Sequence, residues 1–271
     1  FIDAVDVSIV YISIFVSLID LNENYDNMKS KHLLLIAGLS TFTTLYAQAQ
    51  HSLVRLWETE ATLPIPESVL YNATDKVLYV AQIDGKPGEK DGKGGIAKVG
   101  TDGKIIAHDW VAGLDAPKGM GRIGNKLYVA DITSVVEINA KTGAVIKKHE
   151  VEGSKFLNDV TIDAKGNVYV SDTETKNVYL LKNGKVSVYA ENFTRPNGLL
   201  AVGTDLLIAD SGTLKKLSSD KKLTVIAEGM EKSTDGIEQV KPGEYIVSCW
   251  SGVVYYVTSK GAEKLLDTSA D

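Results

Sequence analysis

The sequence has almost no cysteine and little histidine, which excludes several kinds of site. Cys249 has no second cysteine to pair with, so an intramolecular disulfide and a cysteine-based zinc or redox motif are excluded. None of the four histidines lies near Cys249 in the sequence, so nothing suggests an activated thiol nucleophile. No run rich in Lys or Arg occurs and the formal net charge is -6, which argues against a nucleic-acid partner. The chemistry is therefore expected among carboxylates and amides.

A long amphipathic helix is also missing after residue 60, and a repeat takes its place. Five copies of a polar residue, a short strand, a turn and a second strand can be aligned. They begin at Glu67, Lys118, Asn158, Asn197 and Asp235. The last four starts are separated by 40, 39 and 38 residues, and the longer first interval contains a Gly- and Lys-rich insertion at residues 84–95. Such regular spacing is typical of a propeller rather than of an irregular sandwich.

Each copy continues into two more strands, such as NVYLLKNG and KVSVYAEN after Asp172. Val, Ile, Leu and Tyr alternate with polar residues, and Asn-Gly, Thr-Gly and Asp-Lys pairs mark the turns. Four strands in roughly 40 residues correspond to one propeller blade. The sequence therefore predicts an all-β propeller of four-stranded antiparallel blades. Acidic residues that end the second strand, Asp131, Asp172 and Asp210, are expected to bond turn amides.

The N-terminal segment has the features of an export signal. From Met28 a basic start is followed by a short apolar stretch and the motif Ala47-Gln48-Ala49, which predicts a signal peptide at residues 28–49. The alternative is a buried helix or a membrane anchor, although the apolar stretch is short for a bilayer span. Residues 1–27 are interpreted as upstream or mis-called sequence, with a short transmembrane segment as the alternative. The propeller domain is then residues 50–271, periplasmic or extracellular, with no stable membrane insertion after cleavage.

The first residue of every repeat is polar. In a propeller this position begins the innermost strand, so the five side chains should meet at one mouth of the central channel. We call Glu67, Lys118, Asn158, Asn197 and Asp235 the polar ring. Carboxylate and amide oxygens favour a hard divalent cation such as Ca²⁺. A solvated polar mouth without a metal is the alternative.

Four blade-opening motifs, PESVLYN, FLNDVTIDAKGNVYVSD, RPNGLL and STDGIEQV, resemble those of the SMP-30/gluconolactonase/LRE-like propellers. The resemblance covers about residues 60 to 271 and implies six blades. It also implies one divalent cation on Glu67, Asn197 and Asp235, with Asn158 completing the site or holding substrate. Ca²⁺ is expected, with Mg²⁺, Mn²⁺ or Zn²⁺ as alternatives. By the same resemblance Asp235 is the general base of lactone hydrolysis.

Two residues depart from that family pattern. Phe156 stands where the lactonases often have an arginine that grips a sugar-acid substrate. Lys118 is unusual in a metal-lined channel, and we expect it to pair with Glu67 or to bind an anionic group of a small-molecule substrate. The resulting hypothesis is a metal-dependent hydrolase of a lactone or related ester. The alternative is a non-catalytic secreted propeller that binds a small molecule or a protein.

The fifth repeat ends close to the last residue of the sequence, so a sixth copy would begin at about residue 274. An unmatched apolar segment, Ser52 to Glu60, precedes the first copy. Propellers commonly close by letting an N-terminal strand complete the last blade. We therefore expect an incomplete last blade, a C-terminally truncated chain, and residues 52–60 as the outer strand of a sixth blade.

Overall fold

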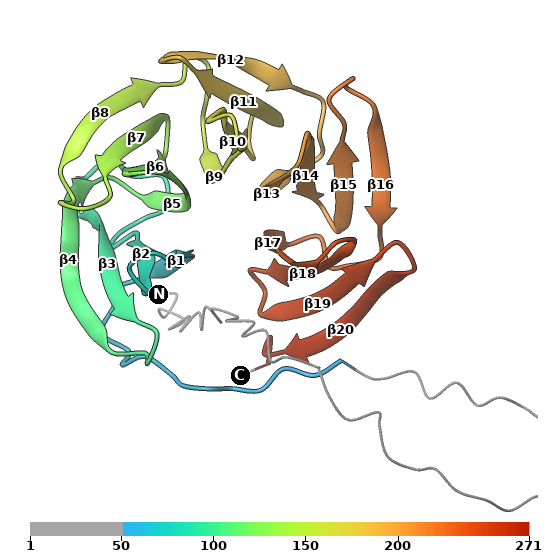
Figure 1. Cartoon of the computed structure of the whole chain (residues 1–271), viewed down its shortest axis with the longest axis horizontal. Helices are drawn as coiled ribbons and strands as arrows, with labels where there is room; N and C mark the ends of the chain where they lie inside the picture. The colour runs from blue at the N-terminus through green and yellow to red at the C-terminus, as the bar shows by residue number, and fades with distance from the viewer. Residues whose placement is uncertain (1–50, 271) are drawn as a thin grey trace, which may run out of the picture.

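The computed structural model describes residues 51–270, which form five four-stranded antiparallel sheets around a central axis (Figure 1). Blade one contains β1 (Pro66–Asn72), β2 (Val77–Gln82), β3 (Gly94–Gly100) and β4 (Ile105–Leu114). Blade two contains β5 (Pro117–Ile123), β6 (Lys126–Asp131), β7 (Ser134–Asn139) and β8 (Val145–Glu150). Blade three contains β9 (Leu157–Ile162), β10 (Val168–Asp172), β11 (Asn177–Lys182) and β12 (Lys185–Ala190). Blade four contains β13 (Pro196–Val202), β14 (Asp205–Asp210), β15 (Thr213–Leu217) and β16 (Leu223–Ala227). Blade five contains β17 (Thr234–Lys241), β18 (Glu244–Cys249), β19 (Val253–Thr258) and β20 (Gly261–Asp267).

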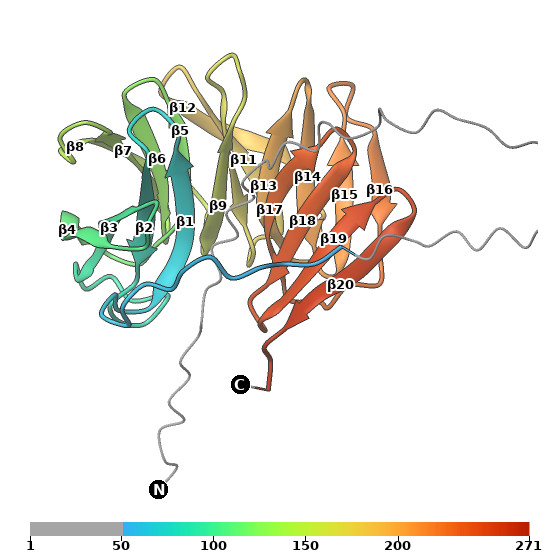
Figure 2. The ribbon, with the colours of Figure 1, turned by 60° about the horizontal axis from the view of Figure 1, so that its bottom comes forward.

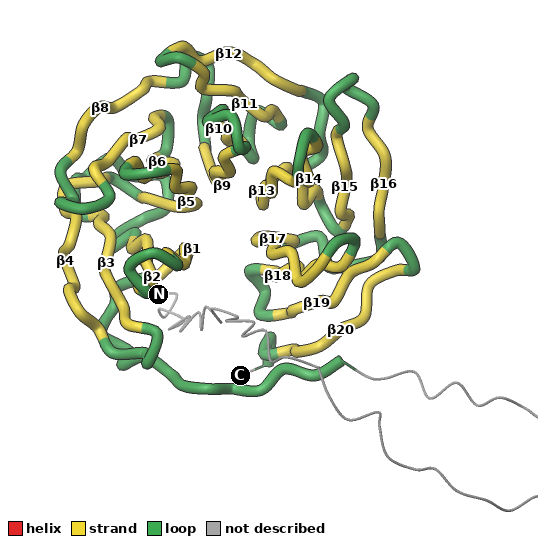
Figure 3. Tube along the Cα trace, viewed as in Figure 1, coloured by secondary structure: helices red, strands yellow, loops and turns green. Residues whose placement is uncertain are grey.

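In every blade the strands follow chain order from the axis to the rim, as the repeat predicts. Within residues 51–270 all regular structure is strand (Figure 3), so the all-β prediction is confirmed. None of the described residues forms a helix that is long and apolar enough to cross a membrane. The predicted signal peptide at 28–49 and the segment 1–27 lie outside the described residues.

Strands inside the blades are more buried than strands at the rim. β6 and β10 are buried on both faces because each lies between two neighbouring blades, whereas the rim strand β8 is mostly exposed. Four apolar clusters fill the spaces between consecutive blades. One of them joins Tyr79 of blade one to Leu127 of blade two, and another joins Leu207 of blade four to Val247 of blade five. The blades thus bury their faces against one another.

Residues 51–63 run along the outside from blade five to blade one (Figures 1 and 2), and we call them the strap. His51 hydrogen-bonds Glu263 on β20 at 2.8 Å and stacks on Tyr256. Leu53 packs on the apolar cluster of blade five, while Trp57 and Leu63 pack on that of blade one. The strap therefore covers parts of the two blade faces that have no neighbouring blade among residues 51–270.

The expectation that residues 52–60 form a strand is wrong, because they pair with no strand and have no regular structure. A β-strand needs a partner, and no inner strands of a sixth blade stand beside this segment within residues 51–270. Its apolar side chains insert singly into the flanking blades instead. The described structure therefore has five blades, and six-bladed closure stays a prediction.

Candidate functional site

A β-bulge lies at the polar-ring position of every inner strand. Pairing shifts register between Pro66 and Ser68 in β1, between Pro117 and Met120 in β5, and at the equivalent places in β9, β13 and β17. A bulge removes one residue from the ladder and re-aims its side chain. The same local irregularity in all five blades turns the polar ring toward the axis.

The five polar-ring residues line a single cavity of about 200 Å³ at this mouth of the channel. The other lining residues are Ile83, Pro87, Phe156, Arg195 and Trp250. The structure thus brings together every site residue predicted from the sequence. The insertion after β2 contributes Pro87, so part of it lies at this mouth.

Asp235 and Asn197 form a bonded pair on neighbouring inner strands. Asn197 Nδ2 donates to Asp235 Oδ1 at 2.7 Å. Burial raises the pKa of Asp235 to about 6, although this hydrogen bond and the nearby Arg195 guanidinium oppose the rise. The pKa of Glu67 is also raised well above its ordinary value, first by burial and then by repulsion from Asp235. Two acids at this mouth therefore hold protons more tightly than free carboxyls do.

Asp159 is a buried acid behind the ring that the sequence analysis did not single out. Its carboxylate accepts hydrogen bonds from the amides of Leu199 at 2.6 Å and Val160 at 2.8 Å, and so ties β9 to β13. Burial nevertheless raises the pKa of Asp159 to about 7. One signal was available: four of the five residues that follow the ring position are Ser or Gly, and only blade three has an acid there.

Lys118 does not form the expected ion pair with Glu67. Its side chain is only 1% exposed. The ammonium donates to the carbonyl oxygens of Ala116 at 2.9 Å and Pro87 at 3.0 Å, and it lies 4.4 Å from the centre of the Phe156 ring. Burial lowers the pKa of Lys118, and Glu67 partly offsets this through charge. The first alternative, an ion pair with Glu67, is therefore wrong, because two carbonyls and an aromatic face hold the ammonium; binding of an anionic group by Lys118 stays a prediction.

The strand-end acids bond turn amides, as predicted, and thereby position the cavity wall. Asp172 accepts from the amides of Lys155 at 2.7 Å and Phe156 at 3.2 Å. Asp210 accepts from the amide of Arg195 at 2.6 Å. In blade five this place is occupied by Cys249, which is buried, and burial raises its pKa to about 12. Cys249 is thus a protonated thiol at neutral pH and is not activated for nucleophilic attack.

Arg195 is the second residue missed from the sequence. It stands two positions before Asn197, the same offset at which the family resemblance expects an arginine before Asn158. The arginine absent from blade three is thus present in blade four, at the wall of the same cavity. Trp250 lines the same cavity and is 52% exposed, but the repeat pattern does not mark it as a site residue.

Within residues 51–270, no group of three or more His, Cys, Asp or Glu side chains is placed so that it could hold a metal ion. The polar ring instead combines two carboxylates with two amides. Asn158 Nδ2 donates to Thr173 Oγ1 at 3.0 Å, which leaves its amide oxygen free for another partner. Any cation here would need amide oxygens as well as carboxylates, a mixture that Ca²⁺ accepts.

Comparisons with known proteins support the propeller architecture alone. No family model matches the sequence, and no curated protein matches it. Among solved structures, a nidogen/laminin complex is similar with a TM-score of 0.63 at 16% identity, covering 74% of this chain and 80% of that one. Virginiamycin B lyase from Staphylococcus aureus, solved with quinupristin, has a TM-score of 0.57 at 11% identity, covering 74% and 69%. A streptogramin B lyase has a TM-score of 0.56 at 10% identity, covering 75% and 84%. At such low identities the likeness extends to the fold alone, and the chain is a β-propeller.

Proposed function

We propose that this protein is a divalent-cation-dependent hydrolase of a small lactone or related ester. The observation that carries the proposal is the meeting of Glu67, Asn158, Asn197 and Asp235, from four different blades, in one cavity. The motif resemblance to the SMP-30/gluconolactonase/LRE-like propellers assigns the same four residues to metal and substrate. Geometry and resemblance therefore point to one site.

The donor set fits a hard cation. Glu67 and Asp235 are half-buried carboxylates, and repulsion from Asp235 raises the pKa of Glu67, a cost of ionisation that a bound cation would offset. Asn197 and Asn158 would add neutral oxygens. Held there, a cation would polarise the carbonyl oxygen of the bound substrate. Lys118 would not compete for these oxygens, since its ammonium is turned to the carbonyls of Ala116 and Pro87.

Asp235 is the proposed general base. Asn197 fixes the direction of its carboxylate through the 2.7 Å hydrogen bond. Without a cation, burial raises the pKa of Asp235 to about 6, and a bound cation would favour the ionised form that accepts a proton. Asp235 would take a proton from an attacking water, whose oxygen forms a bond to the carbonyl carbon. The acyl C–O bond of the ring would then break, and the leaving oxygen would take the proton back from Asp235 to become a hydroxyl. Arg195 lies close enough to stabilise the ionised form of Asp235.

A panel of lactones and esters, assayed with and without chelator, tests the proposal. Hydrolysis should be lost with EDTA, return with Ca²⁺, and be lost in Asp235→Ala. Asp220→Ala, which alters an exposed acid in a turn of blade four, is the control and should keep full activity. Full activity in Asp235→Ala would contradict the role of this residue. Product analysis separates hydrolysis, which adds water, from elimination, which does not.

The second candidate is a non-catalytic propeller that binds a small molecule or a protein at the same mouth. Trp250 favours it, because an aromatic residue 52% exposed beside a cavity is common at recognition surfaces. The likeness to the propeller of a nidogen/laminin complex shows that the fold also occurs in binding proteins. Tight ligand binding without turnover of any ester would favour this candidate.

Two predictions about the whole chain accompany the proposal. Export through the segment at 28–49 predicts that the secreted protein begins near Gln50, which N-terminal sequencing would show. Six-bladed closure, which the family resemblance implies, stays the second prediction; in the described structure the strap crosses between blades five and one.

A further inference from the structure

Arg195, a charged residue of the cavity lining, has a side-chain N–H whose hydrogen-bonding capacity is unused among residues 51–270. Asp235 is bonded to Asn197, and Lys118 is bonded to two carbonyl oxygens. Arg195 Nη1, in contrast, is shielded from solvent and has no hydrogen-bond partner among residues 51–270. A guanidinium N–H without an acceptor is costly in a protein interior, and buried polar groups normally have partners.

The backbone amide of Arg195 is hydrogen-bonded, whereas Nη1 of its side chain has no hydrogen-bond partner among the described residues. Asp210 accepts the Arg195 amide at 2.6 Å and is itself paired with Lys215 at 2.6 Å. Asp235 feels the charge of Arg195, yet the two form no ion pair within 4.0 Å. The guanidinium is thus anchored beside the cavity without a protein acceptor for Nη1.

Apolar side chains from several blades complete the lining of the cavity. Phe156 stands between Lys118 of blade two and Arg195 of blade four, and Ile83 and Trp250 add further apolar surface. The volume of about 200 Å³ limits the size of any occupant. An engineered cavity of about 150 Å³ holds benzene, so this one accommodates a single ring with a small substituent.

We propose that the cavity binds a compact cyclic carboxylate, with the carboxylate on Arg195 and the ring against Phe156 and Trp250. Arginine favours this group because its planar fork matches the two oxygens of a carboxylate. A turn of the Arg195 side chain brings Nη1 from its shielded position to the ligand. This deepens the proposed function by naming a ligand class, and it rests on the location of that site but not on hydrolysis.

Benzoate and benzamide are suitable probes, because they share a ring and nearly the same shape and differ in charge. Calorimetry in the presence of EDTA should show benzoate binding at least tenfold more tightly than benzamide. Arg195→Met should remove that preference, whereas Arg195→Lys should retain part of it. Arg122→Met is the matched control, because Arg122 also has a buried unpaired N–H but lies on β5 outside the cavity lining.

Three results would overturn the proposal. Equal affinity for the two probes in the unaltered protein would do so, and this comparison needs no variant to fold. A preference for benzoate that survives in Arg195→Met would assign the anion to another group. A preference seen only with Ca²⁺ and unaffected by Arg195→Met would place the carboxylate on the cation instead, which would leave the proposed hydrolase intact.

Discussion

Glu137 of blade two is a buried carboxylate held by two basic side chains. Lys126 lies 2.8 Å from one of its oxygens and His149 lies 3.0 Å from the other. Burial acts to raise the pKa of Glu137, but the hydrogen bonds from Lys126 and His149 outweigh it and hold the pKa below the ordinary 4.5. Because the folded protein favours the ionised form, Glu137 stabilises the fold above about pH 4.5 and loses this contribution as the pH falls through its lowered pKa.

Glu137→Gln should therefore lower the free energy of unfolding by about 1–2 kcal/mol at pH 7, and the difference should shrink below about pH 4.5. Denaturant titration across this pH range measures it. Glu244→Gln is the control, because its partner Lys241 is 62% exposed and the pair should be worth less than about 0.5 kcal/mol. A constant difference down to pH 3 would show that the charge of Glu137 is not the cause.

At the scale of elements, the inner strands approach so closely at the ring that two of them require glycine. A Cβ on Gly198 would overlap the carbonyl oxygen of Asp235, and one on Gly119 would overlap the carboxylate of Asp159. Neither glycine has a positive φ, so the requirement comes from packing between blades and not from backbone conformation. The small residue that follows four of the five ring positions thus lets neighbouring strands bring their polar side chains together.

Gly198→Ala should push β13 away from β17, lower the free energy of unfolding by about 2–4 kcal/mol and weaken ligand binding at the cavity. A thermal melt and the benzoate titration measure the two effects. Gly88→Ala is the matched control, since a Cβ there meets nothing within 4 Å. Equal stability of the two variants would show that the strands can separate without cost.

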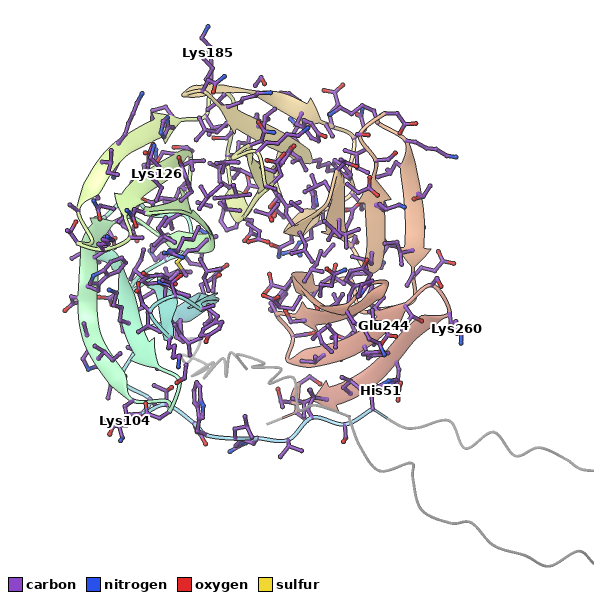
Figure 4. All side chains as sticks on the ribbon, in the orientation of Figure 1. His51, Lys104, Lys126, Lys185, Glu244 and Lys260 are labelled. Carbon is purple, nitrogen blue, oxygen red and sulfur yellow. The ribbon has the colours of Figure 1, made fainter. Side chains whose placement is uncertain are left out.

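At the scale of the whole molecule, the strap links the first and fifth blades. His51 (Figure 4) and Leu53 attach it to blade five, and Trp57 attaches it to blade one over Gly103. The other blades bury both faces against neighbours, so the outer faces of blades one and five depend on this segment for cover.

Trp57→Ala should cost about 1–3 kcal/mol of stability, because a half-buried indole leaves an apolar face open to water. Hydrogen exchange should increase most in blade one. Leu56→Ala is the control, because Leu56 is 65% exposed and should have little effect. Unchanged melting and exchange in Trp57→Ala would mean that the strap does not stabilise the open side of the propeller.

The repeat by itself determined the fold class, the five blade starts and the polar ring. Strand alternation and turn residues are local signals, and a position repeated in every blade must lie at the same radius of a propeller. The strand-end acids were equally predictable, since Asp172 and its equivalents bond amides in the turn beside them.

Only the tertiary structure decided the direction of Lys118, the presence of Arg195 and Asp159 at the site, and the path of the strap. These features depend on groups brought together from different blades. The carbonyl oxygen of Pro87 binds the Lys118 ammonium, which therefore does not pair with Glu67. Residues 52–60 are unpaired because no inner strands lie beside them within the described chain. Periodicity places a residue on a blade, but packing between blades selects the partner of its side chain, because those contacts join residues far apart in the sequence.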